Sequence, residues 1–177
     1  RNQKFKPTDG YRSFYSFDVP LISENNTLTN TISHRYYSQY FDNNIFSLSM
    51  LLKTANSITG DDVKLSERLN VPSSRLRGFE SGKVGPKDGS DFIGGNYASS
   101  INATTTIPMI LENVQSVDIV LFADAANIWG VDYNSSLDKA GIRSSVGIGI
   151  DWLTPVGPLT FSFAQPITKE STDIEET

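Results

Sequence analysis

Apolar residues alternate with small or polar residues along most of the chain, and this period of two indicates β-strands with one apolar face. The clearest case is Ser145–Trp152, where Val146, Ile148, Ile150 and Trp152 alternate with serine, glycine and aspartate. We expect about seven such strands and no helix. They are Tyr11–Val19, Thr27–Phe41, Ile45–Lys53, Asn96–Ile107, Val117–Asp124, Ser145–Trp152 and Leu159–Ala164. The pattern predicts an all-β protein.

Two kinds of all-β protein fit this alternation, a lipid-facing barrel and a water-soluble sandwich. The second face of the strands is filled by Gly, Ser, Thr and Asp, which a wet barrel lumen would permit. Aromatic residues also gather near strand ends, as they do at membrane interfaces: Tyr36, Tyr37, Tyr40, Phe41, Trp129 and Trp152. Both features favour a membrane barrel, although the pattern by itself leaves the two folds about equally open.

The segment from about residue 60 to residue 95 has neither a strand period nor a helix period. Loops longer than roughly 12–15 residues are uncommon and are usually either functional or disordered. This long loop contains the sequence Arg75-Leu76-Arg77-Gly78-Phe79, which we call the arginine motif. A guanidinium fork beside a flexible glycine and a ring that favours burial is better suited to docking in a cavity than to solvent. We therefore expect an ordered loop.

Composition and charge exclude several functions. The chain has 177 residues, enough for one domain, and a net charge of −5 without a basic stripe, so we expect no nucleic-acid binding. It has no cysteine, and its one histidine, His34, has no neighbouring acidic pair. Neither a serine-nucleophile elbow nor a phosphate-binding loop occurs. We expect no enzyme activity, no cofactor and no metal site. The chain begins at Arg1 without a leader, which is typical of a mature form or an excised piece.

The arginine motif belongs to a longer series of sequences that resembles one family. It is followed by Val84-Gly85-Pro86 and Ile93-Gly94-Gly95-Asn96. The remaining elements of the series are Pro7–Gly10, Phe122–Trp129, Trp152–Leu159 and Phe161–Pro166. In this order, and over nearly all of the chain, they resemble BamA-type outer-membrane β-barrel assembly proteins.

The resemblance implies a fold and a site. Residues 1–177 would be the C-terminal part of a sixteen-stranded antiparallel, up-and-down transmembrane β-barrel, with the long loop folded into the lumen and the closing strand absent after an acidic tail at 168–177. The site residues would be Arg75, Arg77, Gly78 and Phe79 of the motif and Asp124 of the inner wall. Arg77 would approach Asp124 in a partly wet site. Thr104 stands where some relatives have a second acidic residue, and Ala126 where glycine is common.

The resemblance also implies a function. The chain would belong to a non-enzymatic factor of the bacterial outer membrane that assembles and inserts other barrels. Its partners would be the lipid bilayer, unfolded outer-membrane protein clients and accessory lipoproteins. Two alternatives remain: a two-partner secretion pore of the same superfamily, whose loop plugs a channel, and a soluble β-sandwich binding module.

Overall fold

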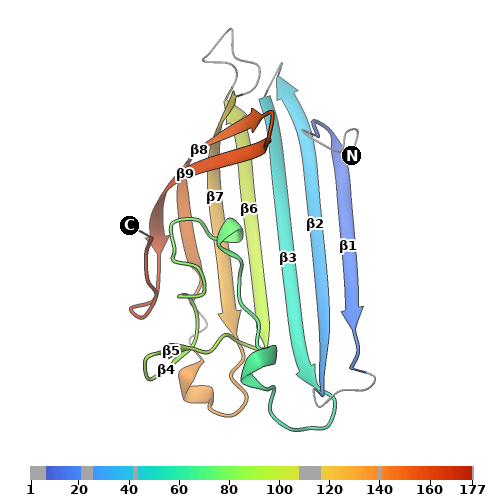
Figure 1. Ribbon diagram of the computed structural model, residues 1–177, viewed down its shortest axis with the longest axis vertical. Helices are drawn as coiled ribbons and strands as arrows, with labels where there is room; N and C mark the ends of the chain where they lie inside the picture. Colours follow the sequence, from blue (N-terminus) through green and yellow to red (C-terminus); the bar gives the residue numbers. More distant parts are fainter. Residues whose placement is uncertain (1–6, 21–25, 42–43, 108–116, 139–140, 177) are drawn as a thin grey trace.

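The computed structural model describes residues 7–20, 26–41, 44–107, 117–138 and 141–176, and within these ranges the fold is all-β (Figure 1). Seven long strands lie where the sequence predicts them. They are β1 Gly10–Asp18, β2 Thr27–Phe41, β3 Asn44–Ser57, β6 Tyr97–Ile107, β7 Val117–Trp129, β8 Arg143–Thr154 and β9 Gly157–Thr168. Several run further than predicted. For example, β7 continues past Asp124 to Trp129, because its backbone stays paired with β6 although the apolar alternation ends.

The long strands form one antiparallel sheet in the order β1-β2-β3-β6-β7-β8-β9. Each strand pairs with its neighbour in the chain, except that the long loop separates β3 from β6. This confirms the predicted up-and-down sheet. A sandwich requires two packed sheets. The only other sheet among the described residues is a short hairpin of β4 Lys87–Asp88 and β5 Asp91–Phe92.

The two faces of the sheet differ as the alternation predicts. In β8 and β9, Ile148 lies opposite Phe163, and Ile150 lies opposite Phe161. Val146, Trp152 and Leu159 belong to the same exposed apolar band. The other face holds small residues: a Cβ atom at Gly149 would lie 2.8 Å from the side chain of Val120 in β7. The apolar face that the alternation predicts is thus present on these two strands.

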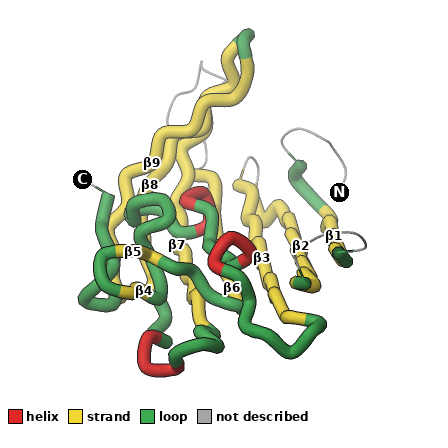
Figure 2. Tube along the Cα trace, turned by 60° about the horizontal axis from the view of Figure 1, so that its bottom comes forward, coloured by secondary structure: helices red, strands yellow, loops and turns green. Residues whose placement is uncertain are grey.

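The long loop lies on the small-residue face, which we call the inner face (Figure 2). It connects Ser57 to Tyr97 and contains the hairpin and two 3₁₀ turns, η1 Leu65–Glu67 and η2 Ser73–Arg75. A third turn, η3 Ser135–Leu137, follows β7. Among the described residues, no helix is long and apolar enough to cross a membrane. In Figure 1 the loop leaves the lower end of β3 and runs back up across β6 and β7.

The loop and the wall share one apolar core. The loop contributes larger side chains, and the wall contributes mostly small ones. The members are Val63, Leu69, Val71, Leu76, Phe79 and Val84 from the loop, and Ala55, Ala98, Ala126 and Ile128 from the wall. Ala126, which stands where glycine is common in the family that the sequence resembles, is buried in this core, so its methyl group contributes to the packing.

The strand order leaves β1 and β9 as the two edges of the sheet. An unpaired edge has free N–H and C=O groups, which hydrocarbon does not tolerate. We therefore expect that the isolated 177-residue chain does not insert into lipid vesicles as a monomer. It should aggregate, pair with a second copy or remain dependent on detergent. A heat-resistant, lipid-inserted monomer on semi-native gel electrophoresis would contradict this.

Candidate functional site: the arginine motif on the inner wall

The centre of the site is an ion pair between the long loop and β7. Arg77 donates from Nε to Oδ2 of Asp124 and from Nη2 to Oδ1, each at 2.7 Å. Its backbone N–H also donates to Oδ2, at 3.1 Å. The side chain of Asp124 is 0% exposed and that of Arg77 is 17% exposed. One carboxylate therefore accepts both arms of the guanidinium fork and a main-chain N–H, which is strong recognition geometry. The carboxylate is therefore dry, whereas the guanidinium keeps a small exposed surface.

Two further residues, Asn102 and Phe122, surround the ion pair of Arg77 and Asp124. Asn102 of β6 lies directly opposite Asp124 in the sheet. Its Nδ2 donates to Asp124 Oδ1 at 2.9 Å and to the carbonyl oxygen of Arg75 at 2.7 Å. The guanidinium carbon of Arg77 lies 3.4 Å from the ring centroid of Phe122, within the range of a cation–π contact. Asn102 thus connects the wall carboxylate to the backbone of the loop.

Arg75 lies beside this pair but does not pair with Asp124. Its Nη1 donates to the hydroxyl of Ser49 on β3 and, at 3.3 Å, to Oδ1 of Asn102. Arg35 of β2 donates from Nε to the same Ser49 hydroxyl at 3.3 Å. Arg75 therefore extends the contact of the loop from β7 across β6 to β3.

Gly78 and Phe79 fix the course of the loop after Arg77. Gly78 has φ +85°, which favours glycine, and a Cβ atom there would lie 2.9 Å from Cβ of Ala164 on β9. Phe79 is 1% exposed and belongs to the shared core. Glycine thus allows the backbone to approach β9 while the phenyl ring turns toward the wall.

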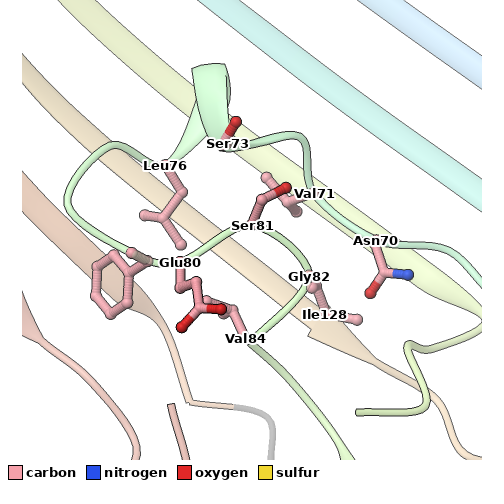
Figure 3. Close-up of a pocket in the computed structure, with 10 residues that line it drawn as sticks. Asn70, Val71, Ser73, Leu76, Glu80, Ser81, Gly82, Val84 and Ile128 are labelled. Atoms are coloured by element: carbon pink, nitrogen blue, oxygen red, sulfur yellow. The ribbon is translucent and has the colours of Figure 1, made fainter. Parts of the chain in front are cut away.

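The packing beneath the motif is tight. Figure 3 shows Leu76, Val71, Val84 and Ile128 around a small gap between the loop and β7. Its volume is about 10 Å³. A cavity needs roughly 10–15 Å³ to hold one water molecule. The apolar contact beneath the motif is therefore tightly packed, and this gap is too small for a ligand.

A second polar cluster holds the base of the long loop. Asp132, which follows β7, accepts from the backbone N–H of Val63 at 2.7 Å and from Asn96 Nδ2 at 2.9 Å. Arg68 Nη2 also donates to this carboxylate. Leu69 and Gly95 exchange two backbone hydrogen bonds nearby. Burial raises the pKa of Asp132, but the hydrogen bonds from Asn96, Val63 and Arg68 and the charge of Arg68 outweigh burial, so the net pKa lies below the ordinary value of 3.8.

This lowered pKa predicts a pH dependence. A carboxylate with a lower pKa in the folded state stabilises that state above its unfolded pKa, and the contribution is lost as pH falls through the folded pKa. The difference in melting temperature between the wild-type full-length protein and Asp132→Asn should be constant above about pH 5 and shrink below about pH 4. The exposed Asp62 provides a matched control as Asp62→Asn. A difference that grows on acidification would contradict the prediction.

Sequence reasoning proposed Arg75, Arg77, Gly78, Phe79 and Asp124, and the structure brings all five to one face of the sheet. It missed Asn102. Asn102 lies two residues before Thr104 and therefore on the same face of the strand, which was the one hint that it faces the site. Its pairing with Asp124, however, depends on the register of β6 and β7. Thr104 lines a polar cavity of about 360 Å³ next to Arg77. Asn102, an amide, is the second wall group that touches Asp124.

The site has the chemistry of a structural joint. No group of three or more His, Cys, Asp or Glu residues that could hold a metal ion occurs in the part of the chain that the structure describes. The polar groups that meet there are paired with one another across the loop and the wall. What the arrangement can do is hold a long loop in one place inside a curved sheet.

Comparison with known proteins finds relatives of similar sequence and a solved structure of similar fold. The chain is 32% identical over 126 residues to outer membrane protein assembly factor BamA of Neisseria meningitidis, covering 55% of this chain and 16% of that protein. It is 28% identical over 132 residues to BamA of Neorickettsia risticii, covering 71% and 18%. The crystal structure of BamA from Haemophilus ducreyi lacking POTRA domains 1–3 matches with a TM-score of 0.88 at 26% identity, over 99% of this chain and 38% of that one.

These matches decide the class of protein. The chain spans less than a fifth of the length of the two curated relatives. The structural match, which covers nearly the whole chain, contradicts the soluble sandwich. The relatives place the chain in the bacterial outer membrane. The family model described as the Omp85 superfamily domain matches residues 1–177, and the chain therefore belongs to the Omp85 superfamily.

Proposed function

We propose that this chain is part of the membrane barrel of a factor that assembles and inserts outer-membrane proteins. The observation that carries the proposal is the docked arginine motif, with Arg77 bound to Asp124, in a chain whose relatives are named assembly factors. The expected partners are the lipid bilayer, unfolded barrel clients and accessory lipoproteins. No catalytic step is assigned to any residue.

The physical role of the joint follows from its position. The long loop is pinned to β3, β6 and β7 by Arg75, Asn102 and Arg77, and its apolar side chains complete a core with the wall. A wall with such an internal brace keeps its curvature when neighbouring strands move. An open strand edge templates a client strand through its free N–H and C=O groups. A barrel that opens such an edge needs the rest of its wall to keep its shape.

The main alternative is a secretion pore of the same superfamily. In such a pore the loop would occupy a channel and would have to move aside for a passenger protein. The two curated relatives described above are assembly factors, which favours assembly over secretion. The packed joint beneath the motif also favours a loop that stays in place.

Reconstitution tests the proposal. The full-length protein is placed in lipid vesicles, and a urea-unfolded outer-membrane barrel is added. We expect the folded client, detected by its heat-modifiable gel mobility, to appear faster than in protein-free vesicles. A vesicle containing an unrelated porin at the same density is the control. Equal rates of client folding in vesicles with the full-length protein and in vesicles with the porin would contradict an assembly function.

A further inference from the structure

The acidic tail after β9 lies alongside the long loop and is hydrogen-bonded to it. Glu80 N–H donates to the carbonyl oxygen of Ile174 at 2.9 Å, and Ile174 N–H donates to that of Lys83 at 3.0 Å. Glu176 N–H donates to the carbonyl oxygen of Gly78 at 3.1 Å. These bonds make a short antiparallel ladder between the tail and the loop segment that directly follows Arg77.

A buried ion pair fixes the start of this ladder to the wall. Arg143, at the beginning of β8, donates from Nε to Oδ2 of Asp173 at 2.9 Å and from Nη2 to Oδ1 at 3.3 Å. Both side chains are 0% exposed. Arg143 also donates from Nη1 to Asn127 of β7 at 3.0 Å and to the carbonyl oxygen of Gly141 at 2.7 Å. The guanidinium is therefore held in one orientation by the wall itself.

The carboxylate of Asp173 connects three segments of the chain. Besides Arg143 of the wall, it accepts at Oδ1 from the N–H of Gly85 in the long loop, at 3.1 Å. At Oδ2 it accepts from the N–H of Glu170 in the tail, at 2.7 Å. Gly85 has φ +106°, and a Cβ atom there would lie 3.1 Å from Cβ of Ile128. Glycine at this position lets the loop backbone reach the carboxylate.

This contact is separate from the joint at the arginine motif. Asp124 holds Arg77 from the middle of β7, whereas Asp173 holds Gly85 from the tail, eight residues further along the loop. A buried ion pair contributes little when compared with an apolar substitute, but removing one partner leaves an uncompensated charge. The contacts of Asp173 are therefore complete only when the wall, the tail and the long loop are all in place.

We propose that the acidic tail is a second anchor of the long loop, with Arg143 and Asp173 as positioning residues. The position of the loop between Gly78 and Gly85 is thereby coupled to the position of the chain that directly follows β9. A displacement of that chain would release the ladder and Gly85 together, while Arg77 stays bound to Asp124. This inference concerns the position of the loop and stands whether or not the protein assembles other proteins.

Hydrogen–deuterium exchange of the full-length protein tests the proposal with Asp173→Asn. The substitution keeps an acceptor oxygen but removes the ion pair with Arg143. The amide of Gly85 should exchange about 10- to 100-fold faster, because a hydrogen bond to a charged group contributes that much to local closure. The amides of Glu80 and Ile174, which donate to backbone carbonyls of the ladder, should also exchange faster, because Asp173 fixes the start of that ladder. Leu69 and Gly95, which pair at the base of the loop, should be unchanged. Lys169→Gln, which removes the exposed ion pair with Glu175, is the matched control.

A distance measurement adds a readout that general destabilisation would not mimic. This chain has no cysteine, so spin labels can be attached after Ser81→Cys in the loop and Ser171→Cys in the tail, both at exposed positions. The distance distribution should be narrow in the otherwise unchanged protein and broad with Asp173→Asn. If that variant does not fold, Arg143→Lys, which keeps the charge but loses the fork, should show the same pattern more weakly. An unchanged distribution, or equally faster exchange at Leu69 and Gly95, would overturn the proposal.

Discussion

Replacing either Arg77 or Asp124 by alanine should weaken the docking of the long loop by about 3 kcal/mol, and replacing both should cost little more. Removing one partner of a buried pair costs roughly 3–5 kcal/mol, and we expect the lower end of that range because Arg77 is 17% exposed. Substitutions of two residues in direct contact are not additive, because either single change already removes the ion pair. The loop should loosen and assembly should fall, while the strands stay paired.

The measurement is a double-mutant cycle on the full-length protein. Loop docking is followed by amide exchange of the loop and assembly by client insertion into vesicles. Lys87→Ala removes a cation from the same loop, where it lies over the ring of Phe92 and not against Asp124, and serves as the control. If the losses from Arg77→Ala and Asp124→Ala add fully in the double mutant, the contact does not carry the docking energy.

An arginine on the outward face of β9 should destabilise the barrel far more than an arginine on its inward face. Phe161 is 53% exposed on the apolar band and pairs with Ile150, near the middle of the strand. An arginine at the bilayer midplane costs about 2–4 kcal/mol in a membrane barrel. The adjacent Ser162 pairs with Gly149 on the inner face, where a charged side chain remains in the lumen.

The test compares Phe161→Arg with Ser162→Arg in the full-length protein, by denaturant unfolding in lipid vesicles. The two positions differ by one residue, so depth in the bilayer is nearly matched. Gly149 would be a poorer inward site, because any side chain there meets Val120. Equal destabilisation by the two substitutions would show that the assignment of faces is wrong.

The strands were predictable because most of them alternate apolar with small or polar residues over a short local stretch. Val146, Ile148 and Ile150 are two residues apart, so in any β-strand their side chains lie on the same face. The exposed apolar band follows from this spacing. The ends of the strands were less predictable. At Ala125 to Trp129 the apolar alternation stops, while the pairing of β7 with β6 continues.

The contacts of the loop depended on information that no local pattern contains. Resemblance to a family pointed to Arg77 and Asp124. The contact of Asn102 with Asp124 became visible only with the register of β6 and β7. Arg143 and Asp173 are thirty residues apart in the sequence and meet only because the tail folds back along the loop. The sequence of the tail is polar and acidic, which is typical of a solvated segment. Its aspartate is nevertheless fully buried.

The measurement that tests the central claim most directly is a high-resolution structure of the full-length protein in a lipid nanodisc. We predict that the long loop lies on the inner face of the barrel, with the Arg77 guanidinium in hydrogen-bonding contact with both oxygens of Asp124, as in this chain. A loop outside the lumen would contradict the account. So would a guanidinium more than about 6 Å from every carboxylate of the inner wall, because an ion pair no longer acts at that separation.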